Sequence, residues 1–378
     1  MRILAFCDRY LPGSKGGGAI RSVSNLVAAL PEFEFFVVTR DRDFTETTAY
    51  EGITTGAWNE VQGARVRYLR PGEGTPEVLE GLVREANPDV LYLNSFFSPE
   101  FTLRPLWLRR KGLLGDRRVV LAPRGEFSAG ALRIKSLKKR LFLSAARAAR
   151  LYEGLVWQAS TPHEAQELRA WAGSAAHVVV APNVPSASGG PEPMPREKTP
   201  GELRLVFVSR VSRKKNLDGA IRALKGVTGR VVYDVYGPLE DPAYWDECRR
   251  LARELPEGVE VRHRGSLPHE QVFGALQAYD AFLMPTHGEN FGHAIWEALA
   301  AGLPVLISDT TAWRGLEAAG VGWDLPVRDE SGFTALLQRL VDMGREEHAS
   351  MSAKARAHAL AFSGNREIVD ANRALFLG

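Results

Sequence analysis

Residues 281–308 read AFLMPTHGENFGHAIWEALAAGLPVLIS, and this stretch decides the fold. The apolar run Ala281–Met284 is typical of a buried strand, and a loop that contains glycine follows it. Apolar residues at helical spacing over Phe291–Ala301 predict a helix, and Val305–Ser308 predicts a second strand. A strand, a helix and a strand in this order predict a βαβ unit, in which both strands lie parallel in one sheet.

The same alternation of short apolar runs and amphipathic stretches extends over most of the chain. Before the quoted stretch we expect strands at 3–7, 35–39, 66–69, 90–94, 119–122, 155–159, 178–181, 205–209, 231–236 and 259–262. Helical patterns lie between most of them. The sequence therefore predicts an α/β protein built from doubly wound parallel sheets.

One stretch interrupts this alternation. Residues 184–202 are rich in Pro, Gly and Ser and show almost no apolar periodicity, which is typical of a linker. The length of 378 residues also favours two domains. We therefore expect a first domain over 1–184, a linker over 185–202 and a second domain over 203–362. A ligand is expected between them, where the carboxyl ends of strands face a cleft.

Composition excludes several classes of protein. With 45% hydrophobic and 25% charged residues, the chain is neither intrinsically disordered nor collagen-like. A formal net charge of +3 is too small for this length to indicate nucleic-acid binding. Cys7 and Cys248 are too few for a disulfide framework, which indicates a reducing compartment. Because no apolar run suits a signal peptide or a membrane span, we expect a cytoplasmic protein, and peripheral attachment to the inner membrane face stays open.

The loop before the predicted helix holds the strongest candidates for a binding site. Unpaired amides at a helix start, together with the positive end of its dipole, suit a phosphate, and Gly292 allows the backbone to approach closely. Glu289 precedes the helix and Glu297 lies inside it, so the two carboxylates reach different parts of an extended ligand. From spacing alone, a capping role for Glu289 and a solvated charge at Glu297 are equally open.

The run from Glu289 to Val305 resembles the Glu-x7-Glu motif of glycosyltransferase family four. This resemblance implies the GT-B fold, in which two Rossmann-like domains face a cleft. It also implies a retaining, metal-independent hexosyltransferase of the bacterial polysaccharide-assembly type. The co-substrate would be a nucleoside-diphosphate sugar, with a UDP-sugar as the first expectation, and no further cofactor is implied. The acceptor would be a hydroxyl of a glycan or a lipid-linked glycan.

The resemblance also assigns roles to residues of this loop. It places a contact to the donor sugar on Glu289 and a hydrogen bond to the nucleotide ribose on Glu297. Backbone groups for the sugar and the phosphate would come from Asn290, Phe291 and Gly292.

A second segment, Phe207–Leu217, agrees with the first. Arg210 and Lys215 lie five positions apart across a tight strand-to-helix turn, where two cations can stabilise a departing diphosphate. The resemblance places an Arg and Lys pair of the family on these two residues, with Lys214 as the alternative register. The competing interpretation is a surface loop whose cations are all solvated.

A glycine-rich loop of Gly16, Gly17 and Gly18 follows the first strand and opens a helix. Its amides are therefore expected to approach the same diphosphate. The loop does not have the Gly-x-Gly-x-x-Gly pattern, which disfavours a dinucleotide site. It resembles the glycine-rich N-terminal loop of the family.

Candidates for the acceptor side are fewer. Residues 122–128 resemble a pattern of the polysaccharide-assembly members, which makes Arg124 a candidate for an acceptor phosphate or a donor contact. Many family members have a histidine where this chain reads Leu91–Ser95. Asn94 in that run can hydrogen-bond a sugar hydroxyl but cannot act as a base. His293 is a further candidate, with capping or packing as the competing interpretation.

Two further stretches of the chain have helical patterns. Arg133–Arg150 mixes cations with apolar residues, so it suits contact with an anionic membrane or a lipid-linked acceptor, whereas such a stretch is more often an ordinary helix with its apolar stripe packed on the core and a solvated basic face. Residues 363–378 are expected to form a helix that returns to the first domain, as in GT-B proteins.

Two other functions stay open. A GT-B nucleotide-sugar epimerase shares the architecture, but it needs more acid and base groups around the sugar than this sequence offers. A non-catalytic subunit that binds a nucleotide sugar or a glycan would not need the intact glutamates and cations. No spacing of histidines and carboxylates predicts a metal site.

Overall fold

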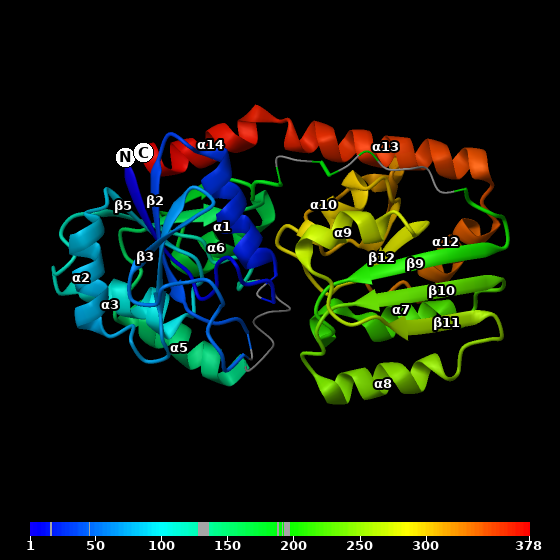
Figure 1. Ribbon diagram of the computed structural model, residues 1–378, viewed down its shortest axis with the longest axis horizontal. Helices are drawn as coiled ribbons and strands as arrows, with labels where there is room; N and C mark the ends of the chain where they lie inside the picture. Colours follow the sequence, from blue (N-terminus) through cyan, green and yellow to red (C-terminus); the bar gives the residue numbers. More distant parts are fainter. Residues whose placement is uncertain (16, 45, 128–135, 187–188, 191, 193–196) are drawn as a thin grey trace. The chain divides into compact units, whose positions relative to one another are not determined.

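The structure is a computed structural model that describes residues 1–15, 17–44, 46–127, 136–186, 189–190, 192 and 197–378. The chain divides into two compact units. The first consists of Met1–Val184 together with Arg366–Gly378, and the second of Pro185–Asn365. Each unit is a largely parallel sheet with helices on its faces (Figure 1).

In its described residues, the first unit holds an eight-stranded sheet in the order β3-β4-β2-β1-β5-β6-β7-β8. All neighbours are parallel except β3 and β4. The strands are β1 Arg2–Phe6, β2 Glu34–Arg40, β3 Trp58–Val61, β4 Ala64–Leu69, β5 Val90–Leu93, β6 Arg118–Leu121, β7 Val156–Ala159 and β8 His177–Val180. The helices are α1 Gly18–Ala29, α2 Pro76–Ala86, α3 Arg104–Arg110, α5 Ser136–Ala148, α6 Pro162–Ala172 and α14 Arg366–Leu377, with a π-helical turn at Pro99–Leu103.

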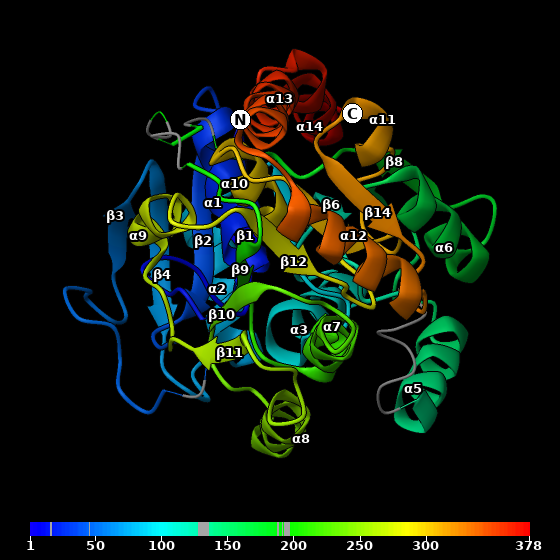
Figure 2. The same ribbon diagram turned by 90° about the vertical axis from the view of Figure 1, so that its right-hand side faces the viewer.

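The second unit holds a parallel sheet in the order β11-β10-β9-β12-β13-β14. Its strands are β9 Glu202–Val208, β10 Arg230–Tyr236, β11 Val259–His263, β12 Ala281–Met284, β13 Val305–Ser308 and β14 Gly322–Leu325. Its helices are α7 Leu217–Leu224, α8 Pro242–Ala252, α9 His269–Leu276, α10 His293–Ala300, α11 Leu316–Ala319, α12 Glu330–Asp342 and α13 Arg345–Ser363. Figure 2 shows α7, α8 and α12 on one side of this sheet and α9, α10 and α13 on the other.

Both sheets have a topological switch point, and this feature locates the candidate site. In the second unit the chain builds outward from β9 toward β11, then returns to place β12 on the other side of β9. The loops after β9 and β12 therefore diverge at the carboxyl edge of the sheet, where open α/β sheets bind their ligands. The first unit repeats this pattern with β1 and β5.

The predicted α/β class with two parallel sheets is confirmed, although several elements differ from expectation, among them α10, which begins at His293 rather than at Phe291. The strands β3 and β14 were not expected, because β3 lies at a partly exposed edge and β14 contains Gly322 and Asp324 within four residues. The last helix begins at Arg366 rather than at 363, because α13 extends to Ser363 and Gly364 follows it.

Helix α14 packs on the first unit, although more than 180 residues of the second unit precede it (Figure 1). The Phe376 ring meets the rings of Phe33 and Phe35 edge-on, with centroids 6.2 Å apart in both cases. The Asn372 side chain donates to the Pro182 carbonyl at 2.8 Å and accepts from Gln158 at 3.1 Å. The helix therefore supplies both apolar and polar contacts to this unit.

Three general features bear on function. Cys7 and Cys248 are free, and burial raises the pKa of each thiol to about 12, so both remain protonated. Over the described part of the chain, no helix is both long and apolar enough to cross a bilayer. The described residues also contain no group of three or more His, Cys, Asp or Glu side chains placed to hold a metal ion.

Candidate active site

The loops after β9 and β12 are joined to each other at the switch point of the second unit. The Lys214 carbonyl accepts hydrogen bonds from the His287 amide at 2.8 Å and from the Thr286 hydroxyl at 3.0 Å. The Asn216 side chain donates to the Pro285 carbonyl at 2.7 Å. These contacts fix the cation-rich loop after β9 against the glutamate-containing loop after β12.

This junction brings Lys215 and Glu289 together in an ion pair between Nζ and Oε1. The two side chains are only 11% and 14% exposed, so water screens the pair weakly. Lys215 ends a short 3-10 turn, Arg213–Lys215, and the Glu289 amide donates to the Thr310 carbonyl at 3.2 Å. A cation and a carboxylate are thus held side by side at the carboxyl edge of the sheet.

Asn216 is a positioning residue that the sequence analysis missed. It adopts a left-handed backbone conformation with φ 55° and directly precedes α7. Its side chain is buried and crosses to the Pro285 carbonyl. Asparagine tolerates this conformation better than most residues. The position of this asparagine, between a run of cations and the apolar start of a helix, could therefore have indicated its role from the sequence.

Asn216→Ala is expected to lower the free energy of unfolding by about 2–4 kcal/mol. The variant loses a buried hydrogen bond, worth about 1–3 kcal/mol, and puts alanine, which tolerates the left-handed region less well than asparagine, at a positive φ, at a further cost of about 1 kcal/mol. Urea unfolding measures the loss. Asn216→Gly is the matched control, because glycine removes only the hydrogen bond and should cost less. Equal stability of the alanine variant and the wild type would contradict this role.

Helix α10 starts directly beyond the Glu289 loop. Gly292 precedes it with φ 79°, and a Cβ at this position would lie 2.8 Å from Ile295 Cδ1, so the site requires glycine. The Gly292 carbonyl accepts from the Ile295 and Trp296 amides at 2.9 and 3.1 Å. The helix, with its positive dipole end, therefore begins at His293, four residues beyond Glu289.

Phe291 holds this helix start in place. Its ring is buried against His293 and Trp313, with centroids 4.6 and 5.6 Å away, and its carbonyl accepts from Trp313 Nε1 at 2.7 Å. The Phe291 carbonyl is thus engaged within the protein. The His293 ring packs on Phe291, which matches the packing interpretation of this histidine. Asn290 lies half-buried between Glu289 and Phe291.

Glu297 points from the interior of α10 toward α9. Its carboxylate is largely buried, and Oε1 lies 3.6 Å from His269 Nδ1. This placement excludes the interpretation of Glu297 as a solvated helix charge.

Arg210 does not join the Lys215 and Glu289 pair. Its Nη1 contacts both oxygens of Glu240 at 2.9 Å, and its side chain is 38% exposed. A ligand that recruits Arg210 must compete with Glu240. The sequence offered no sign of this competition, because Glu240 follows the neighbouring strand β10.

The glycine-rich loop of the first unit is held by Asp43. Asp43 Oδ2 accepts from the Ser14 and Lys15 amides at 2.7 and 2.9 Å. Gly17, with φ 62°, caps α1, and Gly18 begins that helix. Gly16 lies outside the described residues.

Arg124 lies beyond β6 with φ 56°. Its Nη2 donates to Tyr92 Oη at 2.6 Å and to Asn94 Oδ1 at 2.7 Å, and its Nη1 donates to Asn183 Oδ1. These partners are neutral, and no carboxylate of the described residues lies within ion-pair distance. Its Nε is buried and, among the described residues, has no acceptor. A half-buried cation without a counter-ion favours an anionic ligand.

The side chains of Tyr92, Asn94 and Asn183 form a cage around Arg124. This cage is linked by hydrogen bonds to the C-terminal helix. Tyr92 Oη donates to Gln158 Oε1 at 2.6 Å, and Gln158 in turn donates to Asn372 of α14 at 3.1 Å. Asn94 orients Arg124, because its Oδ1 accepts a hydrogen bond from Arg124 Nη2. This role was not predicted from the sequence.

The basic stretch Arg133–Arg150 is only partly described. Residues 133–135 lie outside the described residues, and α5 covers Ser136–Ala148. Leu141 on this helix is 65% exposed, whereas Ala146 is buried.

Comparison with known proteins finds similarity to glycosyltransferases. Residues 193–358 match the family described as Glycosyl transferases group 1. This match lies within the second unit and covers less than half of the chain. A GDP-mannose-dependent alpha-(1-6)-phosphatidylinositol dimannoside mannosyltransferase of Mycobacterium tuberculosis is 32% identical to this chain over 165 residues, which cover 42% of this chain and 40% of that protein.

A D-inositol 3-phosphate glycosyltransferase 1 of Catenulispora acidiphila is 30% identical over 176 residues, covering 44% of this chain and 42% of that protein. The chain thus matches about two fifths of the length of each of these glycosyltransferases.

Solved GT-B structures share the fold of the whole chain. Sucrose-phosphate synthase of Thermosynechococcus elongatus superimposes with a TM-score of 0.72 at 17% identity, over 100% of this chain and 98% of that one. HepE of Anabaena, in complex with UDP and glucose, gives 0.71 at 16% identity, over 99% and 98%. The predicted GT-B fold is therefore confirmed.

Proposed function

We propose that the chain transfers a hexose-type sugar from a nucleoside-diphosphate sugar, with a UDP-sugar as the first expectation, to a hydroxyl of a glycan or a lipid-linked glycan. The observation that carries this proposal is the Lys215 and Glu289 pair beside the start of α10. A diphosphate is stabilised by a cation and by helix-start amides, whereas sugar hydroxyls are bound by a carboxylate. All three groups lie at the switch point of one sheet.

In this proposal the protein acts on the charge of the leaving group. Negative charge develops on the diphosphate as the bond to the anomeric carbon breaks, and Lys215 and the amides at the start of α10 stabilise it. Each such donor contributes roughly 2–4 kcal/mol to lowering the barrier. Arg210 adds a further cation once it leaves Glu240. Glu289 holds the sugar, and Glu297 holds the ribose.

The finer steps are also proposals. The acceptor hydroxyl attacks from the face that the diphosphate leaves, which retains the anomeric configuration, and the departing phosphate takes the acceptor proton. Neither a metal ion nor another cofactor takes part. The start of α1 at Gly17 and Gly18 adds amides for the donor phosphate.

On the acceptor side, Arg124 is proposed to bind an anionic group such as the phosphate of a lipid-linked acceptor. Its cage of neutral partners without a counter-ion supports this assignment. Contact of α5 with an anionic membrane stays a prediction.

The names of similar proteins support nucleotide-sugar chemistry. The mycobacterial relative is named GDP-mannose-dependent, and the HepE structure contains UDP and glucose. They differ in the base, so both bases belong in the test.

Ligand-dependent thermal unfolding tests the proposal through binding. The full chain is unfolded alone and with UDP, GDP or dTDP, and one of the three is expected to raise the Tm of the second unit. A ligand at 100 times its Kd adds about 2.7 kcal/mol of stability. Lys215→Ala should remove most of the increase, whereas Arg249→Ala, a surface variant on α8, should keep it. An unchanged Tm with all three nucleotides at millimolar concentration would reject the proposal.

A further inference from the structure

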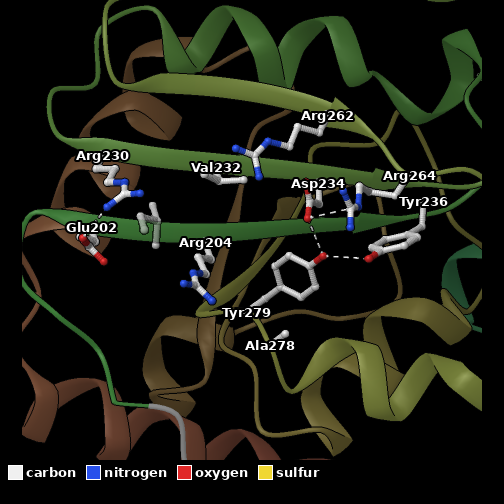
Figure 3. A pocket seen from close by; sticks show the side chains of 11 residues that line it. Glu202, Arg204, Arg230, Val232, Asp234, Tyr236, Arg262, Arg264, Ala278 and Tyr279 are labelled. Atoms are coloured by element: carbon white, nitrogen blue, oxygen red, sulfur yellow. Dashed lines mark hydrogen bonds and ion pairs between the residues drawn. The ribbon is translucent and has the colours of Figure 1, made fainter.

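A pocket of about 420 Å³ lies on the sheet of the second unit, over β9, β10 and β11 and beside the end of α9 (Figure 3). None of the proposed donor-binding residues lines it. Its lining residues are Glu202, Leu203, Arg204, Arg230, Val232, Asp234, Tyr236, Arg262, Arg264, Ala278 and Tyr279.

Four arginines make the pocket rich in positive charge. Three of them are matched by carboxylates: Arg230 with Glu202 at 3.4 Å, Arg264 with Asp234 at 3.8 Å, and Arg262 with Glu260. Because Glu260 is not among the lining residues, the lining itself holds four guanidinium groups and two carboxylates. The excess positive charge favours an anionic ligand.

Arg204 is the cation that is available to such a ligand. Its backbone amide donates to Asp280 at 2.7 Å, but within the described residues its guanidinium has no hydrogen bond and no ion pair. In Figure 3, Arg262 reaches over β10 toward Val232, and Arg204 extends from the neighbouring strand. The two guanidinium groups flank the middle of the pocket.

The other end of the pocket is rich in hydrogen-bond acceptors. Tyr279 gives its hydroxyl proton to Asp234 Oδ2 at 2.8 Å, so Tyr236, 3.0 Å away, donates to Tyr279. Asp234 is 8% exposed, and its Oδ1 receives no hydrogen bond among the described residues. A buried carboxylate oxygen without a donor is costly, and a donor drawn into this end of the pocket relieves that cost.

We propose that this pocket binds a hexose phosphate as a second ligand, separate from the nucleotide sugar. The phosphate is held by the guanidinium groups of Arg204 and Arg262. The hydroxyls of the sugar lie toward Asp234 and Tyr236, and the apolar surface of Val232 contacts the ring. This combination of an anion and several hydroxyls matches the two ends of the pocket.

The pocket adjoins the loop that carries Arg210. The Tyr236 carbonyl accepts from the Ser209 amide at 3.0 Å, and Gly237 donates to Gly265, directly after Arg264, at 2.9 Å. A bound hexose phosphate therefore lies beside the backbone that positions Arg210. Any effect of that ligand on turnover rests on the proposed function, whereas its binding does not.

Isothermal titration of the full chain with glucose 6-phosphate and mannose 6-phosphate tests the inference. At least one is expected to bind with 1:1 stoichiometry, and at least tenfold tighter than inorganic phosphate or free glucose. Arg204→Gln and Arg262→Gln should each weaken binding by roughly tenfold or more. Arg249→Gln, which replaces an exposed arginine outside the pocket, should leave the affinity unchanged. Saturating UDP should not displace the hexose phosphate.

Three outcomes would overturn the inference. Absence of binding by both hexose phosphates rejects the site. Inorganic phosphate that binds as tightly as a hexose phosphate rejects the sugar as part of the ligand. Displacement by UDP assigns the pocket to the nucleotide site. The proposed function is tested by a different experiment, the thermal unfolding with nucleoside diphosphates. A failure of the hexose phosphate titration can therefore be distinguished from a failure of the proposed function.

Discussion

Lys215→Ala is expected to lower kcat by roughly 100- to 1000-fold, the loss typical of removing one group that stabilises the charge of a leaving group. Lys215 is the cation that the fold holds beside Glu289, where water screens it weakly. Release of nucleoside diphosphate from the donor measures the effect, and circular dichroism verifies that the variant is folded.

Lys214→Ala is the matched control for this prediction. The backbone carbonyl of Lys214 accepts from Thr286 and His287, and alanine keeps that carbonyl. Its kcat should remain within about twofold of the wild type. If Lys214→Ala lost as much activity as Lys215→Ala, or if Lys215→Ala lost none, the assignment of the leaving-group cation would be wrong.

Deletion of residues 366–378 is expected to unfold the first unit at ambient temperature. Helix α14 buries Ile368, Leu375 and Phe376 and places Asn372 in the network of Gln158. Large buried side chains contribute roughly 2–5 kcal/mol each, and a domain has only about 5–15 kcal/mol of stability in total. Differential scanning calorimetry should therefore show the loss of the transition that belongs to the first unit.

A shorter deletion controls for trimming the terminus. Removing only Leu377 and Gly378, both exposed, should leave the melting profile within a few degrees of the wild type. A chain without residues 366–378 that melted like the full chain would contradict the assignment of α14 to the first unit.

Much of the fold was predictable because parallel strands buried on both faces leave continuous apolar runs. The strands at Ala281–Met284 and Val305–Ser308 have the bounds that the sequence predicts. Strands without a continuous apolar run were not predicted. Trp58–Val61 has two polar residues in its middle and lies at a partly exposed edge, and its pairing depends on β4.

The candidate site was predictable as two loops but not as a set of contacts. Lys215 and Glu289 are 74 residues apart, and only the position of β12 beside β9 brings them together. Arg210 is close to Lys215 in the sequence, yet its side chain pairs with Glu240, which follows β10. Strand order decides both outcomes, and local sequence pattern does not encode strand order.

The surroundings of Arg124 show the same limit. Tyr92 and Asn94 lie at the end of β5, whereas Asn183 follows β8, and none of the three belongs to a motif with Arg124. The sheet order β5-β6-β7-β8 aligns their carboxyl ends, so the cage became visible only in the folded chain.

The central claim is that the loops after β9 and β12 form the donor site of a sugar transferase. Its most direct test is the release of nucleoside diphosphate from UDP-glucose, UDP-galactose, GDP-mannose and dTDP-glucose by the wild type and by Glu289→Ala. We expect the wild type to turn over at least one donor and Glu289→Ala to be slower by roughly 100-fold or more. Absence of release from all four donors, or equal release by Glu289→Ala, would contradict the claim.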